Sequence, residues 1–313
     1  MMSTKIPSAP IKIPHKGQLE IGETRSQEPD RNFHRGGRSF YFFDFDDNIA
    51  FLTTPLVLFH RQTGEELNLS SGEWAIHHHS VGKSGPYIDY EIRFDDQTGS
   101  FRYFRDLDMK EVEKLATRRQ PFVEDVIQSL HLPDTQWKGP SWNCFYHATF
   151  NQRPVSIITA RGHQIETIKQ GIAEFKKAGY LVAEPNYLSV FPVSNKQTRT
   201  LLHDADFKAS TAELKQRAIR ASVEQAIEKY GYSPHHRFGM SDDDPKNIQL
   251  IVQEMTRLKS SFPEMSFFMI ETHNGDFIKH EISQHGLKSE YIDDDTAYSS
   301  DQLDLFNATR RRP

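Results

Sequence analysis

The sequence of 313 residues contains one cysteine, Cys144, so no internal disulfide can form. This composition favours a reducing compartment, and we expect a cytoplasmic protein in which Cys144 is a buried structural thiol. The sequence also lacks any apolar run of the ~18 residues that a membrane helix needs. Residues 1–16 contain three prolines and no apolar core of the kind found in secretory signals. We therefore expect neither secretion nor a membrane partner.

Basic charge is not in excess, because 38 lysines and arginines face 43 acids and give a net charge of −5. Without a sustained basic stripe, nucleic acid is not an expected partner. Apolar residues, at 36%, are also fewer than the about 45–50% usual for globular chains, although that average counts glycine. Polar ends would explain much of this shortfall, and we predict disordered tails at 1–38 and, for the most part, at 285–313.

The most informative stretch is residues 40–49, where an apolar run ends in several acids. Four aromatic residues, 40–43, follow a Gly-Gly-Arg turn and are typical of a buried strand. Asp44, Asp46 and Asp47 come directly after them. Ligands bind at the carboxyl ends of strands in open α/β sheets, so this stretch is a candidate site.

Strands and helices alternate over the rest of the chain. Apolar strands are predicted to begin near residues 40, 155, 187, 236 and 265, with amphipathic helices between them. This alternation favours an α/β fold with a five-stranded parallel sheet, formed by 39–49 and 154–284. Residues 50–153 interrupt it, and we predict a β-hairpin flap with a turn at Gly64, followed by a mixed α+β cap.

Polar side chains follow three of the predicted strands. They are Asp44 and Asp46 after the first, Thr159 after the second, and Asp242 and Asp243 after the fourth. A parallel sheet would gather these groups at one edge, where four carboxylates would repel each other unless a hard cation neutralised them. Oxygen ligands of this kind favour Mg²⁺, and the arrangement suits metal-dependent phosphoryl chemistry.

The order of these motifs resembles the haloacid dehalogenase-like (HAD) hydrolase superfamily. The resemblance is carried by Phe-Phe-Asp-Phe-Asp at 42–46, Ile-Ile-Thr at 157–159 and Phe-Gly-Met-Ser-Asp-Asp at 238–243. It covers about 39–280 without the insertion and implies a Rossmann-like core. The second acid of the first motif, Asp46, resembles the pattern of the phosphatases of the superfamily rather than that of the dehalogenases. The resemblance thus implies a phosphomonoesterase, and a closing cap would favour small phosphorylated metabolites.

The resemblance also implies residue roles. Asp44 would be the nucleophile that forms an aspartyl-phosphate, and Asp46 would act as general acid and base. Thr159, with the backbone amides of Ala160 and Arg161, would hold phosphoryl oxygens. Asp44, the carbonyl of Asp46, Asp242 and Asp243 would bind Mg²⁺.

A lysine should offset this negative charge, and the sequence leaves three candidates. Lys215, near the start of the helix before the fourth strand, has the most suitable place, with Lys208 and Lys196 as alternatives. The chain departs from the family pattern at Asn48, where Thr or Val is usual. Asp47 is expected to be a loop residue only.

Other features have plainer interpretations, and two other functions stay open. Asp244 is predicted to cap the helix that begins at Pro245, and Asn247 to support the site from its first turn. Histidines 77–79, if on a strand, would place alternate rings on one face, but no zinc-like spacing accompanies them. Transfer of the phosphoryl group to an acceptor other than water, or binding without catalysis, are the alternatives. The sequence does not indicate an oligomeric state.

Overall fold

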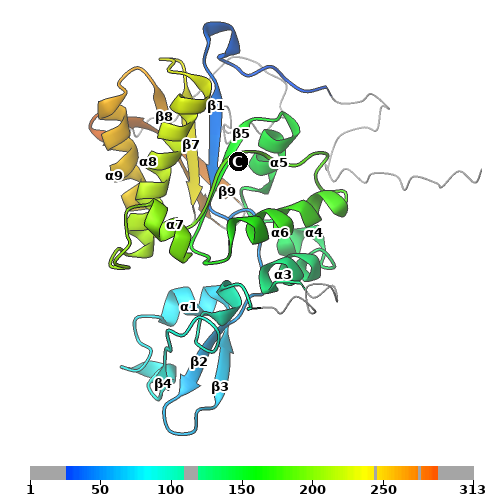
Figure 1. Ribbon diagram of the computed structural model, residues 1–313, viewed down its shortest axis with the longest axis vertical. Coiled ribbons are helices and arrows are strands. Elements are labelled where there is room, and N and C mark those ends of the chain that lie inside the picture. Colours follow the sequence, from blue (N-terminus) through cyan, green and yellow to red (C-terminus); the bar gives the residue numbers. More distant parts are fainter. Residues whose placement is uncertain (1–25, 109–118, 243–244, 274–275, 288–313) are drawn as a thin grey trace, which may run out of the picture.

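The computed structural model describes residues 26–108, 119–242, 245–273 and 276–287. A mixed sheet of seven strands, in the order β10-β9-β8-β7-β1-β5-β6, lies between two layers of helices (Figure 1). Strands β6, β5, β1, β7 and β8 pair in parallel, while β9 and β10 are antiparallel additions beside β8. The strands are β1 (Ser39–Phe43), β5 (Pro154–Thr159), β6 (Asn186–Pro192), β7 (Arg237–Asp242), β8 (Ser266–His273), β9 (Asp276–Ser283) and β10 (Gly286–Leu287).

The chain is thus an α/β protein, but the prediction of a five-stranded parallel sheet is wrong. The five predicted strands are all present, but the two antiparallel strands at the sheet edge, β9 and β10, were not predicted. Strand β9 has the sequence Asp-Phe-Ile-Lys-His-Glu-Ile-Ser, in which charged residues interrupt the apolar ones. A strand near a sheet edge need not be apolar on both faces, so it lacks the continuous apolar run that marks central strands.

Strand β1 is central, and both its faces are covered. Phe40 and Phe42 lie in the same apolar cluster as residues of α8 (Thr211–Tyr230) and α9 (Pro245–Ser261). Tyr41 and Phe43 lie in a second cluster with residues of α5 (Trp142–Phe150) and α6 (Ile165–Lys177). Because successive side chains point to opposite faces, a strand between two helix layers needs apolar residues at every position. This explains the aromatic run that precedes the acids.

The predicted insertion divides into two parts. Its first half forms a small antiparallel sheet of β2 (Leu56–His60), β3 (Glu66–Leu69) and β4 (Tyr90–Glu91), with α1 (Ser71–His77) beside it. The predicted hairpin is present as β2 and β3, with Gly64 at φ 71° in its turn. We call residues 56–104 the small sheet domain; it stands beyond the carboxyl end of β1 (Figure 1).

The second half of the insertion packs on the main sheet. Helix α3 (Pro121–Ser129) lies against α6, α5 contacts β1 and β5, and Trp137 of α4 (Asp134–Trp137) is buried in the same cluster. These helices therefore complete one face of the core. Part of the predicted cap, residues 109–118, lies outside the described residues.

The histidine run does not lie on a strand. His77 ends helix α1, and His78 caps it. The helix forms because Ser70 and Glu73 make reciprocal hydrogen bonds at its start, as a capping box. The expectation that alternate histidine rings share one face held only for a strand, so it does not apply to His77 and His79.

Regular contacts with the core begin before residue 39, although the sequence predicted a disordered tail over 1–38. We call residues 26–38 the N-terminal arm. The carboxylate of Asp30 is buried and accepts hydrogen bonds from the backbone N–H of Ser39 at 2.7 Å and its hydroxyl at 2.9 Å. The backbone N–H of Glu28 donates to Asn151 Oδ1 at 2.7 Å. Within the described residues, no helix is long and apolar enough to cross a membrane.

Candidate active site

Three charged side chains meet at the carboxyl ends of β1 and β7. Asp44 directly follows β1, and Asp242 ends β7, which pairs in parallel with β1. Lys215, from the first turns of α8, places its Nζ 3.0 Å from Asp44 Oδ2 and 2.9 Å from Asp242 Oδ2. The structure therefore brings together three of the predicted site residues from segments far apart in the chain.

The two alternative lysines lie elsewhere. Lys196, at the start of α7 (Lys196–Leu201), pairs with Asp96 of the small sheet domain at 2.7 Å. Lys208 pairs with Asp206 at 3.2 Å, and its side chain is 82% exposed. Of the three candidates, Lys215 is the one that contacts the aspartates of the site.

Lys215 is held as an ammonium ion. Burial alone would lower its pKa, but attraction to Asp242 and then Asp44 outweighs burial, and the pKa is raised. The side chain of Lys215 is 2% exposed and that of Asp242 is fully buried. Asn247 also donates to Asp242 Oδ1 at 3.1 Å from the first turn of α9, as the sequence predicted for a supporting residue. One cation between two acids leaves a formal charge of minus one.

Asp46 lies beside Thr159 and is held by Arg161. The guanidinium donates to the Asp46 carboxylate from Nε at 2.9 Å and from Nη2 at 2.6 Å. Thr159 Oγ1 lies 3.4 Å from Asp46 Oδ2 and accepts from the backbone N–H of Arg161 at 3.3 Å. The sequence predicted Arg161 as a substrate-binding residue through its backbone amide, with its side chain by default on the surface, whereas the side chain orients the predicted acid and base.

The Arg161 guanidinium also contacts the insertion. It is 1% exposed, donates to Thr54 Oγ1 at 2.7 Å, and faces the rings of Phe104 at 5.0 Å and Phe122 at 4.7 Å. Thr54 in turn donates to the carboxylate of Asp125 in α3. The one sequence signal for Arg161 was its position, two residues after the predicted strand that ends at Thr159. Its partners come from distant segments and could not be identified from that signal.

Asp47 is more than a connecting loop residue. Its backbone is in the left-handed region at φ 56°, and its carboxylate hydrogen-bonds to Ser71 of the small sheet domain. Burial, followed by repulsion from Asp46, raises the pKa of Asp47, while Ser71 and Arg161 act in the opposite direction. Asp47 therefore links the acidic turn to the insertion.

Asn48 has a structural role that explains its departure from the family pattern. Its buried side chain donates from Nδ2 to the carbonyl of Ser241 at 3.0 Å and to its hydroxyl at 2.8 Å. Its Oδ1 accepts from Ser141 Oγ at 2.7 Å and from Thr272 Oγ1 at 3.0 Å. Thr or Val could not satisfy these four groups. The amide therefore fixes the turn after β1 to β7, β8 and α5.

The carboxylates near the ends of β1 and β7 carry more negative charge than the neighbouring cations offset. Asp44, Asp46, Asp47 and Asp242 carry four formal negative charges, which Lys215 and Arg161 offset only in part. Carboxylate oxygens with excess negative charge suit Mg²⁺. Among the described residues, no three His, Cys, Asp or Glu side chains are gathered closely enough to hold a metal. The predicted ligand Asp243 and the predicted cap Asp244 lie outside those residues.

The structure thus places Asp44, Asp46, Thr159 and Asp242 at or just beyond the carboxyl ends of β1, β5 and β7, and the small sheet domain stands beyond the same end of β1 (Figure 1). Comparison of the chain with models of known families, with curated proteins and with solved structures found no match. Only the arrangement of the residues bears on the function.

Proposed function

We propose that this protein is a magnesium-dependent phosphomonoester hydrolase of the haloacid dehalogenase-like type, acting through an aspartyl-phosphate on a small phosphorylated substrate. The observation that supports this most is the buried Lys215, which Asp44 and Asp242 share at the ends of neighbouring parallel strands. The Lys215 ammonium beside Asp44 offsets the charge of a carboxylate, and a carboxylate is the nucleophile that this chemistry needs. A cytoplasmic setting remains a prediction from the sequence.

In the first step, an Asp44 oxygen attacks phosphorus and the ester P–O bond breaks. Asp46 gives its proton to the leaving oxygen. The hydroxyl of Thr159 and the backbone N–H groups of Ala160 and Arg161 would hold phosphoryl oxygens. In the second step, Asp46 takes a proton from water, the water oxygen attacks phosphorus, and the Asp44 carboxylate leaves as phosphate is released.

Arg161 sets the position of Asp46 for these proton transfers. A bidentate guanidinium fixes a carboxylate plane more tightly than a single ammonium contact would. Thr54 and the aromatic rings hold the guanidinium from the side of the insertion. Asp46 would have to exchange part of its contact with Arg161 for the leaving group before it could carry a proton.

Asp44, the Asp46 carbonyl, Asp242 and Asp243 would hold the magnesium ion. When bound, the ion would offset the charge of the phosphoryl oxygens beside these acids. The small sheet domain stands over this edge, with Phe104 against Arg161 and Ser71 against Asp47. Such a cover favours small substrates over a phosphoprotein.

Steady-state hydrolysis of para-nitrophenyl phosphate with added Mg²⁺ tests the proposal. We expect steady release of phosphate that Asp44→Asn abolishes, because an amide is a poor nucleophile. Asp206→Asn is the matched control, since the Asp206 side chain is 76% exposed and pairs with the exposed Lys208. The control should keep the wild-type rate.

Three outcomes would contradict the proposal. Equal rates for Asp44→Asn and wild type would place the nucleophile elsewhere. Phosphoryl transfer to an added alcohol without steady release of phosphate would indicate a transferase. No turnover over a broad panel of phosphate esters with Mg²⁺ would indicate a binding protein without catalysis.

A further inference from the structure

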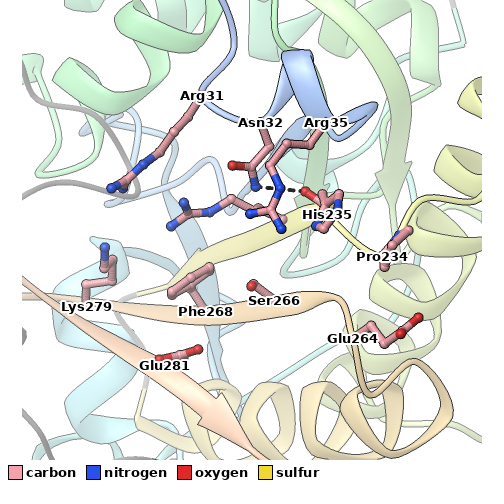
Figure 2. A pocket seen from close by; sticks show the side chains of 11 residues that line it. Arg31, Asn32, Arg35, Pro234, His235, Glu264, Ser266, Phe268, Lys279 and Glu281 are labelled. Atoms are coloured by element: carbon pink, nitrogen blue, oxygen red, sulfur yellow. Dashed lines mark hydrogen bonds between the residues drawn. The ribbon is translucent and has the colours of Figure 1, made fainter.

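A polar cavity lies at the opposite end of the parallel strands from the candidate active site, at the amino ends of β7 and β8 (Figure 2). Its volume is about 670 Å³, within the range of about 300–1,000 Å³ that small-molecule sites occupy. The walls come from the N-terminal arm, the turn before β7, and strands β7, β8 and β9. Arg237 begins β7 and Asp242 ends it, so the two sites are roughly 17 Å apart along that strand.

The strand register places several lining residues on one face of the sheet. Arg237 pairs with Ser266, and Phe268 pairs with Glu281. Paired residues share a face, as do residues two apart in one strand. Arg237, Phe268, Glu281 and Lys279 therefore all point to the same side, where they line the cavity. Figure 2 shows Phe268, Lys279 and Glu281 on this wall.

Phe268 orients two of the cations. Its ring is 3% exposed, with the Arg237 guanidinium carbon 5.0 Å and Lys279 Nζ 5.1 Å from its centroid. Contacts of this kind attract a cation to the ring face. Both positive groups are thus held at the wall of the cavity before any ligand arrives.

The N-terminal arm brings two further cations, Arg31 and Arg35, over the sheet. The arm is fixed there because Asn32 Nδ2 donates to the carbonyl of His235 at 2.9 Å and the Arg237 N–H donates to the carbonyl of Arg38 at 2.9 Å. Gly37 permits this close approach, since a Cβ there would lie 2.3 Å from the His235 carbonyl oxygen. These contacts fix the backbone that carries Arg31 and Arg35 beside the cavity.

The lining has more positive than negative charge, although the whole chain is acidic. Four cations, Arg31, Arg35, Arg237 and Lys279, face two acids, Glu264 and Glu281. Glu264 also accepts from the hydroxyl of Tyr232 at 3.2 Å.

We propose that this cavity binds a small molecule that carries two or more phosphate groups and is about the size of a nucleoside diphosphate. Guanidinium groups match phosphate oxygens in geometry and charge, and three of the four cations are arginines. The polar lining argues against an apolar ligand. The site is separate from the proposed catalytic edge and does not depend on the hydrolase proposal.

Isothermal titration calorimetry of the full chain with α,β-methylene-ADP, which resists hydrolysis, tests this site. We expect binding that weakens roughly tenfold or more in the double variant Arg31→Gln/Arg35→Gln, because two charge-assisted contacts are lost. Both arginines are exposed, so the fold should persist, and thermal unfolding checks this. Lys177→Gln, which removes an exposed charge from α6, is the control and should bind as wild type does.

Several results would overturn the proposal. One is the absence of binding at millimolar probe, and another is equal affinity in wild type and the double variant. Loss of binding in Asp44→Asn, with binding kept in the double variant, would place the probe at the catalytic edge. A parallel titration with citrate distinguishes recognition of phosphate from attraction of any anion. Citrate that binds as tightly as the probe would refute the phosphate site.

Discussion

Replacement of Lys215 by methionine removes the charge at the centre of the candidate active site but keeps most of the side-chain length. In the wild type, one Nζ lies within 3.0 Å of carboxylate oxygens from both Asp44 and Asp242, and the three side chains are at most 10% exposed. Removal of one partner from a buried ion pair costs about 3–5 kcal/mol. Two carboxylates lose their partner here, so we expect a loss of unfolding free energy in the upper part of that range.

Equilibrium unfolding in urea measures this loss, and a variant of the same helix provides the control. Lys229, near the end of α8, is exposed, and Lys229→Met should change the unfolding free energy by no more than about 0.5 kcal/mol. The coupling is measured by combining Lys215→Met with Asp242→Asn. The double variant should be clearly less destabilised than the sum of the two single variants, because both substitutions break the same Lys215–Asp242 ion pair, which can be lost only once.

Two results would refute this reasoning. One is a loss for Lys215→Met as small as that for Lys229→Met, which would mean that solvent screens the cluster. The other is strict additivity of Lys215→Met and Asp242→Asn, which would show that the two groups do not interact in solution.

The remaining predictions concern two buried polar residues. Asn48→Ala should cost ~3 kcal/mol of unfolding free energy, because the buried hydroxyls of Ser141 and Thr272 lose their acceptor; a shift in urea midpoint equivalent to less than about 1 kcal/mol would contradict this. His163 is fully buried, and its ring nitrogens have no hydrogen-bond partner among the described residues. Burial, reinforced by two nearby arginines, lowers its pKa well below the ordinary 6.5. The unfolded chain therefore binds a proton that the folded chain does not, and stability should fall as pH drops below 6.5, by up to ~1.4 kcal/mol per pH unit. His163→Asn should flatten the pH dependence measured between neutral pH and about pH 5, with the exposed His131→Gln as control; an unchanged slope would exclude His163 as its source.

The central strands could be predicted because their sequences report directly on their surroundings. Strand β1 is covered on both faces and must be apolar throughout, so its end was visible where the acids begin. The same holds for β5, which is buried at every position before Thr159. Once these strands were taken to be parallel, the meeting of Asp44 with Asp242 followed from topology. Strand β9 gave no such signal, because polar residues are tolerated near the sheet edge.

The contacts that complete the site could not be predicted from local sequence. Asn48 looked like a departure from a pattern, and its reason lies in hydroxyls from three distant segments. The arm was assigned to a tail because its composition is polar, yet the buried carboxylate of Asp30 ties it to the start of β1. In both cases a single hydrogen-bonding side chain decides the structure, and composition averages over such residues.

Arg161 shows how such a contact changes the mechanism that the motifs alone would suggest. The motifs suggest Asp46 as an isolated acid and base, whereas the structure pairs it with the buried Arg161, whose guanidinium contacts the insertion. Any opening of the insertion that moved Thr54 or Phe104 would remove contacts that hold the guanidinium, and would thereby loosen Asp46. In the proposed mechanism, a displacement that admits a substrate would then also release the carboxylate proposed to exchange a proton with it. Arg161 contacts both Asp46 and the insertion, so it would couple the two events.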